Sequence, residues 1–334
     1  MKHSRSKIEV APHPVRTNRE GIPATQPEDL RNPECGNRGF FLSLSQETSA
    51  MRKYLLLLVT TLLLAACSET PRTDDRTMVV SILPLRTIVG GIVGSDFDIE
   101  VLVPTGASPE TFEPTPRQFA RMNRARQIFS VGLIDFENSL LSKLEEPQRV
   151  VNLSRGIELI EGSCAHHHDG REHAHGVDPH IWTSPRALQQ MAANAYEAIH
   201  AAYPDSTKYT LNYGKLQAAL QQLDREVGSR LKAAGTRYFL IYHPALTYYA
   251  RDYGIRQVAI ENEGKEPSAR ELTRIIKQAR ADGITRILYQ SQFPASAVEI
   301  IARDLHATSV AIDPLREDVL ANIAEITDQI TARP

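Results

Sequence analysis

From residue 78 to the C-terminus, short apolar runs alternate with longer segments in which apolar residues recur every three or four positions. The short runs are typical of strands, and the longer spacing is typical of amphipathic helices. The pattern predicts strands at 78–83, 99–103, 128–131, 150–153, 238–242, 257–260, 284–289 and 308–312. It predicts helices at 84–94, 116–126, 185–203, 244–253, 268–282, 294–306 and 315–332, besides one longer helix. Such alternation indicates an α/β fold with mainly parallel sheets.

The longer helix divides the predicted strands into two sets of four. Apolar side chains recur at helical spacing from Tyr209 to Leu231, Ser206 offers an N-cap, and Gly235 offers a C-cap. At 1.5 Å per residue such a helix spans about 45 Å, long enough to run beside two lobes. We therefore predict two lobes, each a mainly parallel four-stranded sheet with flanking helices, joined by this rigid helix and facing a crevice. The predicted bounds are 78–204 for the N-terminal lobe, 205–235 for the linking helix and 236–334 for the C-terminal lobe.

The segment at 51–67 carries the features of a secretion signal. Met51-Arg52-Lys53 gives a basic start, and the apolar run after it is too short to span a bilayer comfortably. The run ends in Leu-Ala-Ala-Cys67, which resembles the lipobox of bacterial lipoproteins, whose cysteine is lipidated. Residues 68–77 are then expected to form a polar tether. Residues 1–50 lack periodicity, so we expect a disordered extension or a true translation start at Met51.

The cysteines of the chain bear on whether it forms a disulfide, and its net charge bears on whether it binds nucleic acid. Cys35, Cys67 and Cys164 are the cysteines of the chain, and removal of the leader with lipidation of Cys67 would leave Cys164 unpaired. No structural disulfide is therefore predicted. The formal net charge of −2 gives no sign of nucleic-acid binding. We expect a monomer on the periplasmic side of the cell envelope, held to the membrane by its lipid.

A histidine-rich loop at 163–177 lies just before the sequence Asp178-Pro-His180. Neutral imidazole is a common metal ligand near pH 7, so exposed histidines would bind zinc weakly and raise its concentration near the crevice. A solvated loop with no function is the alternative reading of such a composition. Cys164 is either an additional thiolate ligand or incidental. The loop residues proposed as auxiliary ligands are His166, His167, His168, His173 and His175.

Four possible metal ligands follow predicted strands or lie at an equivalent loop. They are Glu110, His180, His243 and Asp313, and each has a proline next to it. Proline fixes φ, so each side chain would stand on a stiff turn that suits a preformed site. In open α/β sheets ligands bind outside the carboxyl ends of the strands. Each residue alone has an ordinary structural explanation, but together they predict a site with two ligands from each lobe. Glu113 is a less favoured substitute for Glu110.

Several short segments, taken together, resemble a known family. They are, in order, GASPETFEPTP at 106–116, DPHIW at 178–182, HPALTYYARDYG at 243–254, EPS at 266–268 and DPL at 313–315. In this order they resemble the signatures of the zinc- and manganese-binding solute-binding proteins of bacterial ABC transporters. The resemblance implies a metal buried between two α/β lobes, delivery to a membrane permease with its ATPase, and no catalysis. It carries ligand roles to His180, His243 and Asp313, whereas the family usually has histidine where this chain has Glu110.

The ligand set allows two metals and several functions. Two imidazoles and two carboxylates suit Zn²⁺, and carboxylate-rich sets also suit Mn²⁺; neutral imidazole and the histidine-rich loop favour zinc. A zinc hydrolase is an alternative, but it would keep an open water position beside three protein ligands. An organic-solute carrier would need aromatic and arginine side chains in its crevice. A surface adhesin is a further alternative that lipid anchoring allows.

Overall fold

The structure of the protein is a computed structural model, and it describes residues 54, 74–161, 176–261, 267–293 and 295–332. The fold lies in one compact unit that extends from Glu69 to the C-terminus. The predicted extension at 1–50, the lipobox with Cys67, and the histidine-rich loop with Cys164 lie outside the described residues. None of the helices in the described ranges combines the length and the apolar character that a membrane crossing needs.

The first lobe is built on a four-stranded sheet in which every neighbouring pair is parallel. Its strand order is β2-β1-β3-β4. The strands are β1 (Asp74–Val80), β2 (Asp98–Val101), β3 (Ala125–Ser130) and β4 (Val150–Asn152). The helices of this lobe are α2 (Leu83–Val93), α3 (Pro116–Arg124), α4 (Asp135–Leu141) and α5 (Pro185–Ala202). The central strands β1 and β3 are buried toward their carboxyl ends, from Thr77 and from Ile128 onward, as expected for a parallel sheet covered on both faces.

The second lobe repeats this plan with strand order β6-β5-β7-β8, again with parallel neighbours throughout. Its strands are β5 (Tyr238–Ile241), β6 (Arg256–Ala259), β7 (Arg286–Gln290) and β8 (Thr308–Ile312). Its helices are α7 (Thr247–Asp252), α8 (Ala269–Ala281), α9 (Ala295–Leu305) and α10 (Val319–Thr331). Two sheets of the same design confirm the predicted α/β fold of two lobes.

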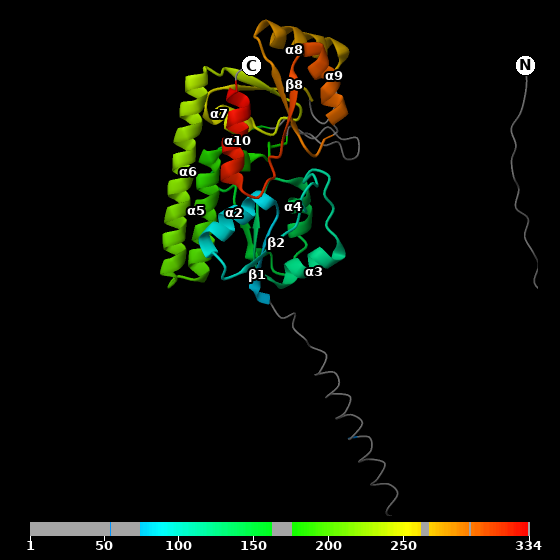
Figure 1. Ribbon diagram of the computed structural model, residues 1–334. Helices are drawn as coiled ribbons and strands as arrows, with labels where there is room; N and C mark the ends of the chain where they lie inside the picture. Colours follow the sequence, from blue (N-terminus) through cyan, green and yellow to red (C-terminus); the bar gives the residue numbers. More distant parts are fainter. Residues whose placement is uncertain (1–53, 55–73, 162–175, 262–266, 294, 333–334) are drawn as a thin grey trace, which may run out of the picture. The chain divides into compact units, whose positions relative to one another are not determined.

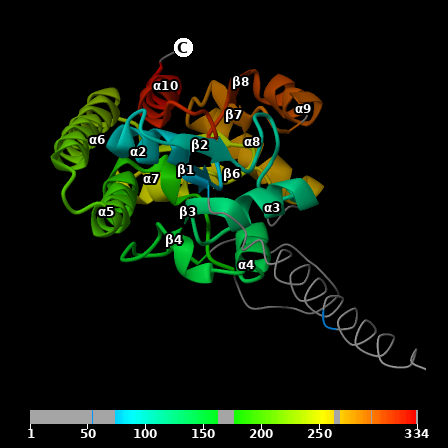
Figure 2. The same cartoon turned by 90° about the horizontal axis from the view of Figure 1, so that it is seen from below.

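The long helix α6 (Thr207–Ala234) contacts helices of both lobes. Ser206 caps its first turn, and Gly235 ends it in the left-handed conformation at φ 67°, which glycine adopts at little cost. The helix packs on α2 and α5 of the first lobe and on α10 of the second. In both views α6 runs beside α5, while α8 and α9 lie away from it (Figure 1, Figure 2). The long helix therefore links the lobes as predicted.

The main hydrophobic core is shared between the lobes. It includes buried residues of the first sheet, of α6, and of α7 and α10 in the second lobe. A separate smaller core lies in the second lobe, around Ile275 and Ala279 of α8, Ile287 of β7 and Val298 of α9. A polar contact also joins the lobes within the main core, because the buried Trp182 indole Nε1 donates to the carbonyl of Pro314 at 3.1 Å.

Several boundaries differ from the predicted ones. Strand β1 begins at Asp74 and so takes in the end of the segment predicted as a tether. The helix predicted at 116–126 ends at Arg124, because Ala125 already pairs within β3. Helix α4 was not predicted. It is short, and the carboxylate of Glu137 within it binds the backbone N–H groups of Val131 and Gly132, a contact that periodicity does not reveal.

Candidate metal centre

Glu110, His180 and His243 lie together where the carboxyl ends of the two sheets face each other. One ligand atom from each of them falls within 4.8 Å of the others. The Nε2 atom of His243 is 2.9 Å from Oε1 of Glu110, and Nε2 of His180 is 3.9 Å from the same oxygen. The two imidazole rings stand 5.3 Å apart at 69°. The side chains of the two histidines are about 95% buried, and that of Glu110 is 14% exposed. The structure thus brings together three of the four predicted ligands.

His180 is held by the residues next to it in the chain. Its ring Nδ1 lies 2.8 Å from Oδ1 of Asp178, and its backbone N–H donates to the same oxygen at 2.9 Å. It precedes a buried turn of 3₁₀ helix at Ile181–Thr183, which leads into the N-cap of α5 at Ser184. With Nδ1 held by a carboxylate, Nε2 faces Glu110. A metal-binding imidazole usually has a carboxylate at its other ring nitrogen in this way, which fixes the orientation of the ring.

Asp178 is itself buried, and its carboxyl remains ionised because of this histidine. Burial acts to raise the pKa of Asp178, but the charge of His180 and the hydrogen bonds from it act in the other direction and prevail. The pKa of Asp178 therefore lies below its ordinary value. The carboxylate is available to orient the His180 ring throughout the neutral range.

His243 is held by residues that are distant in the chain. Its Nδ1 lies 3.4 Å from Oε1 of Glu261, a buried residue just beyond β6. The side chain of Gln290, at the end of β7, accepts from the His243 N–H at 3.3 Å and donates to the His243 carbonyl at 2.6 Å. The ring of Phe293 stacks on the imidazole with centroids 5.2 Å apart. The second histidine therefore also presents Nε2 to Glu110.

The surroundings of His243 favour a positive charge. Burial acts to lower the pKa of His243, but the carboxylates of Glu110 and Glu261 outweigh it and raise the pKa to about 9. Within the described residues the buried Nε2 makes no hydrogen bond of ordinary geometry, although Glu110 lies close to it. A buried nitrogen without such a bond, beside a carboxylate and a second imidazole, is a donor set that fits a divalent cation.

The space between these groups is small. It measures about 30 Å³ and is lined by the three ligands together with, among others, Trp182, Gln292, Phe293 and Leu315. Pockets for organic ligands usually measure about 300–1,000 Å³, whereas one water molecule occupies about 30 Å³ of liquid. The pocket therefore has room for an ion and not for an organic solute.

Asp313 follows β8 as predicted, but it lies outside the group of three. One oxygen of its carboxylate accepts from the Gln292 side chain at 2.8 Å and from the Leu315 N–H at 3.0 Å. Both of these partners line the small pocket, so Asp313 is next to it. Glu113 is exposed and does not belong to the group. The histidines proposed as auxiliary ligands lie outside the described residues.

Two carboxylates of the site were not assigned a role from the sequence. Asp178 stands in the motif that contains His180, and Glu261 directly follows a predicted strand at 257–260. The rule that ligands gather at the carboxyl ends of parallel strands could have identified Glu261, because the other ligands were found in this way. Its contact with His243 depends on strands β5 and β6 being neighbours.

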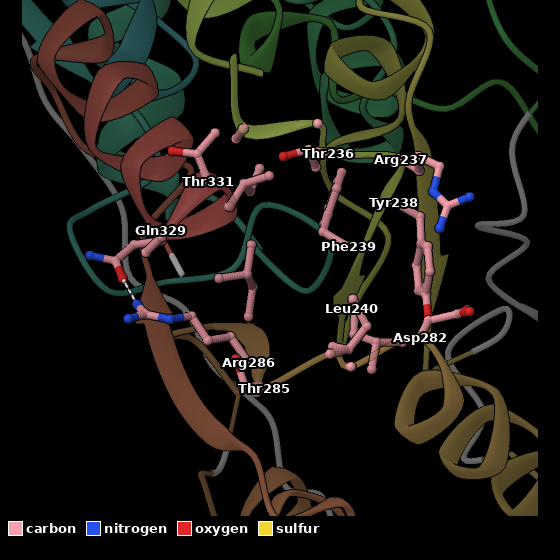
Figure 3. Close-up of a pocket in the computed structure, with 17 residues that line it drawn as sticks. Thr236, Arg237, Tyr238, Phe239, Leu240, Asp282, Thr285, Arg286, Gln329 and Thr331 are labelled. Atoms are coloured by element: carbon pink, nitrogen blue, oxygen red, sulfur yellow. Dashed lines mark hydrogen bonds between the residues drawn. The ribbon is translucent and has the colours of Figure 1, made fainter. Parts of the chain in front are cut away.

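A larger pocket lies at the opposite end of the second sheet (Figure 3). It measures about 240 Å³ and arises because β5 and β7 pair only at Leu240 and Ile241 of β5, so their first residues diverge. In the close-up Asp282 lies against Tyr238, whose hydroxyl donates to it at 2.8 Å (Figure 3). Among the described residues its lining includes one carboxylate, that of Asp282, and neither histidine nor cysteine, so it does not offer a group of metal ligands.

Comparison with known proteins identifies relatives of the same architecture. The family model described as zinc-uptake complex component A, periplasmic, matches residues 78–331. The high-affinity zinc uptake system protein ZnuA of Bacillus subtilis is 29% identical over 272 residues, covering 76% of this chain and 85% of that protein. A crystal structure of a zinc-bound ZnuA deletion mutant is 32% identical, with a TM-score of 0.69, covering 78% of this chain and all of the other.

Some relatives are considerably longer than this chain. The zinc-binding lipoprotein AdcA of Streptococcus pneumoniae strain R6 is 26% identical over 280 residues. The match covers 79% of this chain but only 56% of AdcA. The chain thus spans little more than half the length of that relative.

Proposed function

We propose that this chain, which belongs to the family of periplasmic component A proteins of zinc-uptake complexes, binds its zinc at Glu110, His180 and His243. Proteins of this family are the solute-binding components of ABC importers, and the chain is accordingly a zinc-binding component of such an importer. Zinc is its cargo. The ion would pass from the site to a membrane permease that an ATPase drives.

The convergence of the two imidazoles on one carboxylate carries this proposal. Nε2 of each histidine faces Oε1 of Glu110, while each Nδ1 faces a separate carboxylate. Carboxylates behind the ligands orient imidazoles and make them more basic. Two imidazoles favour the later and softer Zn²⁺ over Mn²⁺, although a carboxylate ligand also suits manganese. Glu110 then takes the place of the histidine that is usual in the family.

We propose Asp313 as the fourth ligand. Its carboxylate accepts hydrogen bonds from Gln292 and Leu315, and these two residues line the pocket, which supports the proposal. Four protein ligands close a zinc site, whereas a catalytic zinc keeps a position for water. The pocket of about 30 Å³ also leaves no room for an organic substrate beside the metal. We therefore infer transport without catalysis.

The flanking segments would place the protein at the membrane. We propose that Cys67 is lipidated and becomes the new N-terminus, so that the mature chain is anchored on the periplasmic side. The histidine-rich loop at 163–177 would gather zinc near the crevice through weak binding. We expect one chain to bind and release zinc as a monomer.

A competitive titration of zinc against manganese tests the site. It compares the chain from Ser68 onward with variants His180→Ala and His243→Ala, and with a variant that lacks residues 166–175. We expect one tight zinc in the parent and in the loop deletion. Each alanine variant should bind on the order of 1,000-fold more weakly, about 4 kcal/mol, because a ligand is lost.

The exposed Glu113 provides the control, since Glu113→Ala should bind zinc like the parent. Loss of tight binding in the loop deletion alone would place the receptor site in the loop and refute the site proposed here. A preference for manganese at equal free concentrations would keep the transport role and change the cargo.

A further inference from the structure

Tyr248 joins the two lobes close to the site through its hydroxyl group. It lies in α7 of the second lobe and is completely buried. Its hydroxyl donates to the carbonyl of Asp178 at 2.7 Å and accepts from the N–H of Ile160 at 3.2 Å. Both of these groups belong to the first lobe. One side chain of the second lobe thus binds two backbone groups of the first.

The two residues whose backbone groups Tyr248 binds are also paired with each other through their other backbone groups. The N–H of Asp178 donates to the carbonyl of Ile160 at 2.9 Å, and the next residues, Glu161 and Val177, form an antiparallel bridge. The tyrosine hydroxyl adds a hydrogen bond to the carbonyl of Asp178, so both the N–H and the C=O of Asp178 have a partner. The backbone of Asp178 is therefore held by the first lobe through Ile160 and by the second lobe through Tyr248.

Asp178 is the residue that orients His180. Its carboxylate holds both the ring Nδ1 and the backbone N–H of His180. We propose that Tyr248 is a positioning residue for zinc binding, because its hydroxyl fixes Asp178 and thereby sets the orientation of His180. The inference rests on the proposed function, in which His180 is a ligand. It adds that the second lobe controls the orientation of a ligand that the first lobe supplies.

The neighbouring Tyr249 separates this role from ordinary packing. It too is completely buried in α7, and its hydroxyl is bonded to the Thr327 hydroxyl at 2.8 Å. That bond connects α7 with α10 inside the second lobe and does not reach the site. Loss of either hydroxyl leaves a buried polar partner without its bond, which costs about 1–3 kcal/mol of stability. Only the loss at Tyr248 should change the geometry around the metal.

The test compares full-length protein with the variants Tyr248→Phe and Tyr249→Phe. We expect Tyr248→Phe to bind zinc about 10- to 100-fold more weakly, as is typical when a group that orients a metal ligand is lost. Tyr249→Phe should keep the parent affinity. Co²⁺ serves as a second probe, because its visible d–d bands report the arrangement of ligands. The bands should change in Tyr248→Phe and stay as in the parent in Tyr249→Phe.

The possible outcomes are distinct. Equal affinity and equal Co²⁺ bands in Tyr248→Phe and the parent would overturn the positioning role, and so would an equal loss in both variants. If the parent itself lacked tight zinc binding, the proposed function would fall first. If Tyr248→Phe fails to fold, the coupling can be tested instead by amide hydrogen exchange of the parent protein with and without zinc. Zinc should slow the exchange of the Ile160 and Asp178 amides, and unchanged exchange would refute the coupling.

Discussion

The two histidines of the site each have a carboxylate at Nδ1, but the carboxylate comes from a different part of the chain in each lobe. In the first lobe, His180 takes its carboxylate partner from Asp178, only two positions earlier, at 2.8 Å. In the second lobe, His243 takes its partner from Glu261, 18 positions later and across a strand boundary, at 3.4 Å. Both arrangements leave Nε2 free to face Glu110. The carboxylate–histidine pair of the first lobe is thus local in the chain, whereas the pair of the second lobe forms only when the second sheet is assembled.

The two carboxylate–histidine pairs also differ in the pKa values of their members. Burial acts to raise the pKa of Asp178, the partner of His180, but the charge and hydrogen bonds of His180 and a hydrogen bond from Thr247 together lower it below its ordinary value. His243 has two carboxylates near it, and these raise its pKa to about 9 against the effect of burial. The metal-free pair of the second lobe therefore carries a proton at neutral pH that zinc must displace.

The largest predicted effect is the pH dependence of the metal-free protein. The folded pKa of His243, about 9, exceeds the ordinary value of 6.5. Its contribution to stability is therefore fully present below pH 6.5 and is lost as the pH rises through 9. We expect the free energy of unfolding, measured by urea titration with a chelator present, to fall by a few kcal/mol across this range. Asp178 acts oppositely: its contribution is present above pH 3.8 and is lost as the pH falls through its lower folded pKa.

The variant Glu261→Gln separates the two pairs in this experiment. It removes one of the carboxylates that raise the pKa of His243, so the decrease in stability on the alkaline side should become smaller. The decrease in the free energy of unfolding at acid pH, which depends on Asp178, should stay as in the parent. An alkaline decrease of the same size in the variant would show that Glu261 does not control the His243 proton.

The next prediction compares the two orienting carboxylates directly. Asp178→Asn and Glu261→Gln each keep the size of the side chain and remove its charge. We expect both to weaken zinc binding by about 10- to 100-fold, with the greater loss for Asp178→Asn, because its contact is shorter and it also holds the His180 backbone. Isothermal competition against a chelator of known affinity measures both. A larger loss for Glu261→Gln would reverse the comparison.

The same contrast explains how much of the fold could be predicted. The periodicity of the chain predicted both sheets and the long helix, because parallel strands are continuous apolar runs and α6 keeps one apolar stripe along its length. It missed α4, which is short and depends on the contacts of Glu137 with the backbone of Val131 and Gly132. It placed the start of β1 at Met78, because Asp74 and Asp75 are polar residues within a strand.

The site was predictable to the extent that its parts are local. Glu110, His180 and His243 each follow a strand or a recognisable turn, so position in the chain predicted that they meet. The contacts of Glu261 and Gln290 with His243 depend on the order β6-β5-β7, which periodicity alone does not give. The orientation of the Asp313 carboxylate toward Gln292 depends on a side-chain contact and could not be derived from spacing.

The smallest predicted effect concerns this last contact. Gln292→Ala removes one hydrogen bond to the Asp313 carboxylate and leaves the one from the Leu315 N–H. If Asp313 is the fourth ligand, zinc competes with Gln292 for it, and the variant should bind zinc a few-fold more tightly. The gain should stay below about tenfold, or 1.4 kcal/mol, because water replaces the lost amide. Gln329→Ala is the control, since Gln329 bonds to Arg286 at the other end of the sheet (Figure 3). Weaker zinc binding by Gln292→Ala would mean instead that Gln292 holds the Asp313 carboxylate in the position that the metal requires. The second lobe would then fix both of its ligands through glutamine side chains, His243 through Gln290 of β7 and Asp313 through Gln292 of the turn after β7.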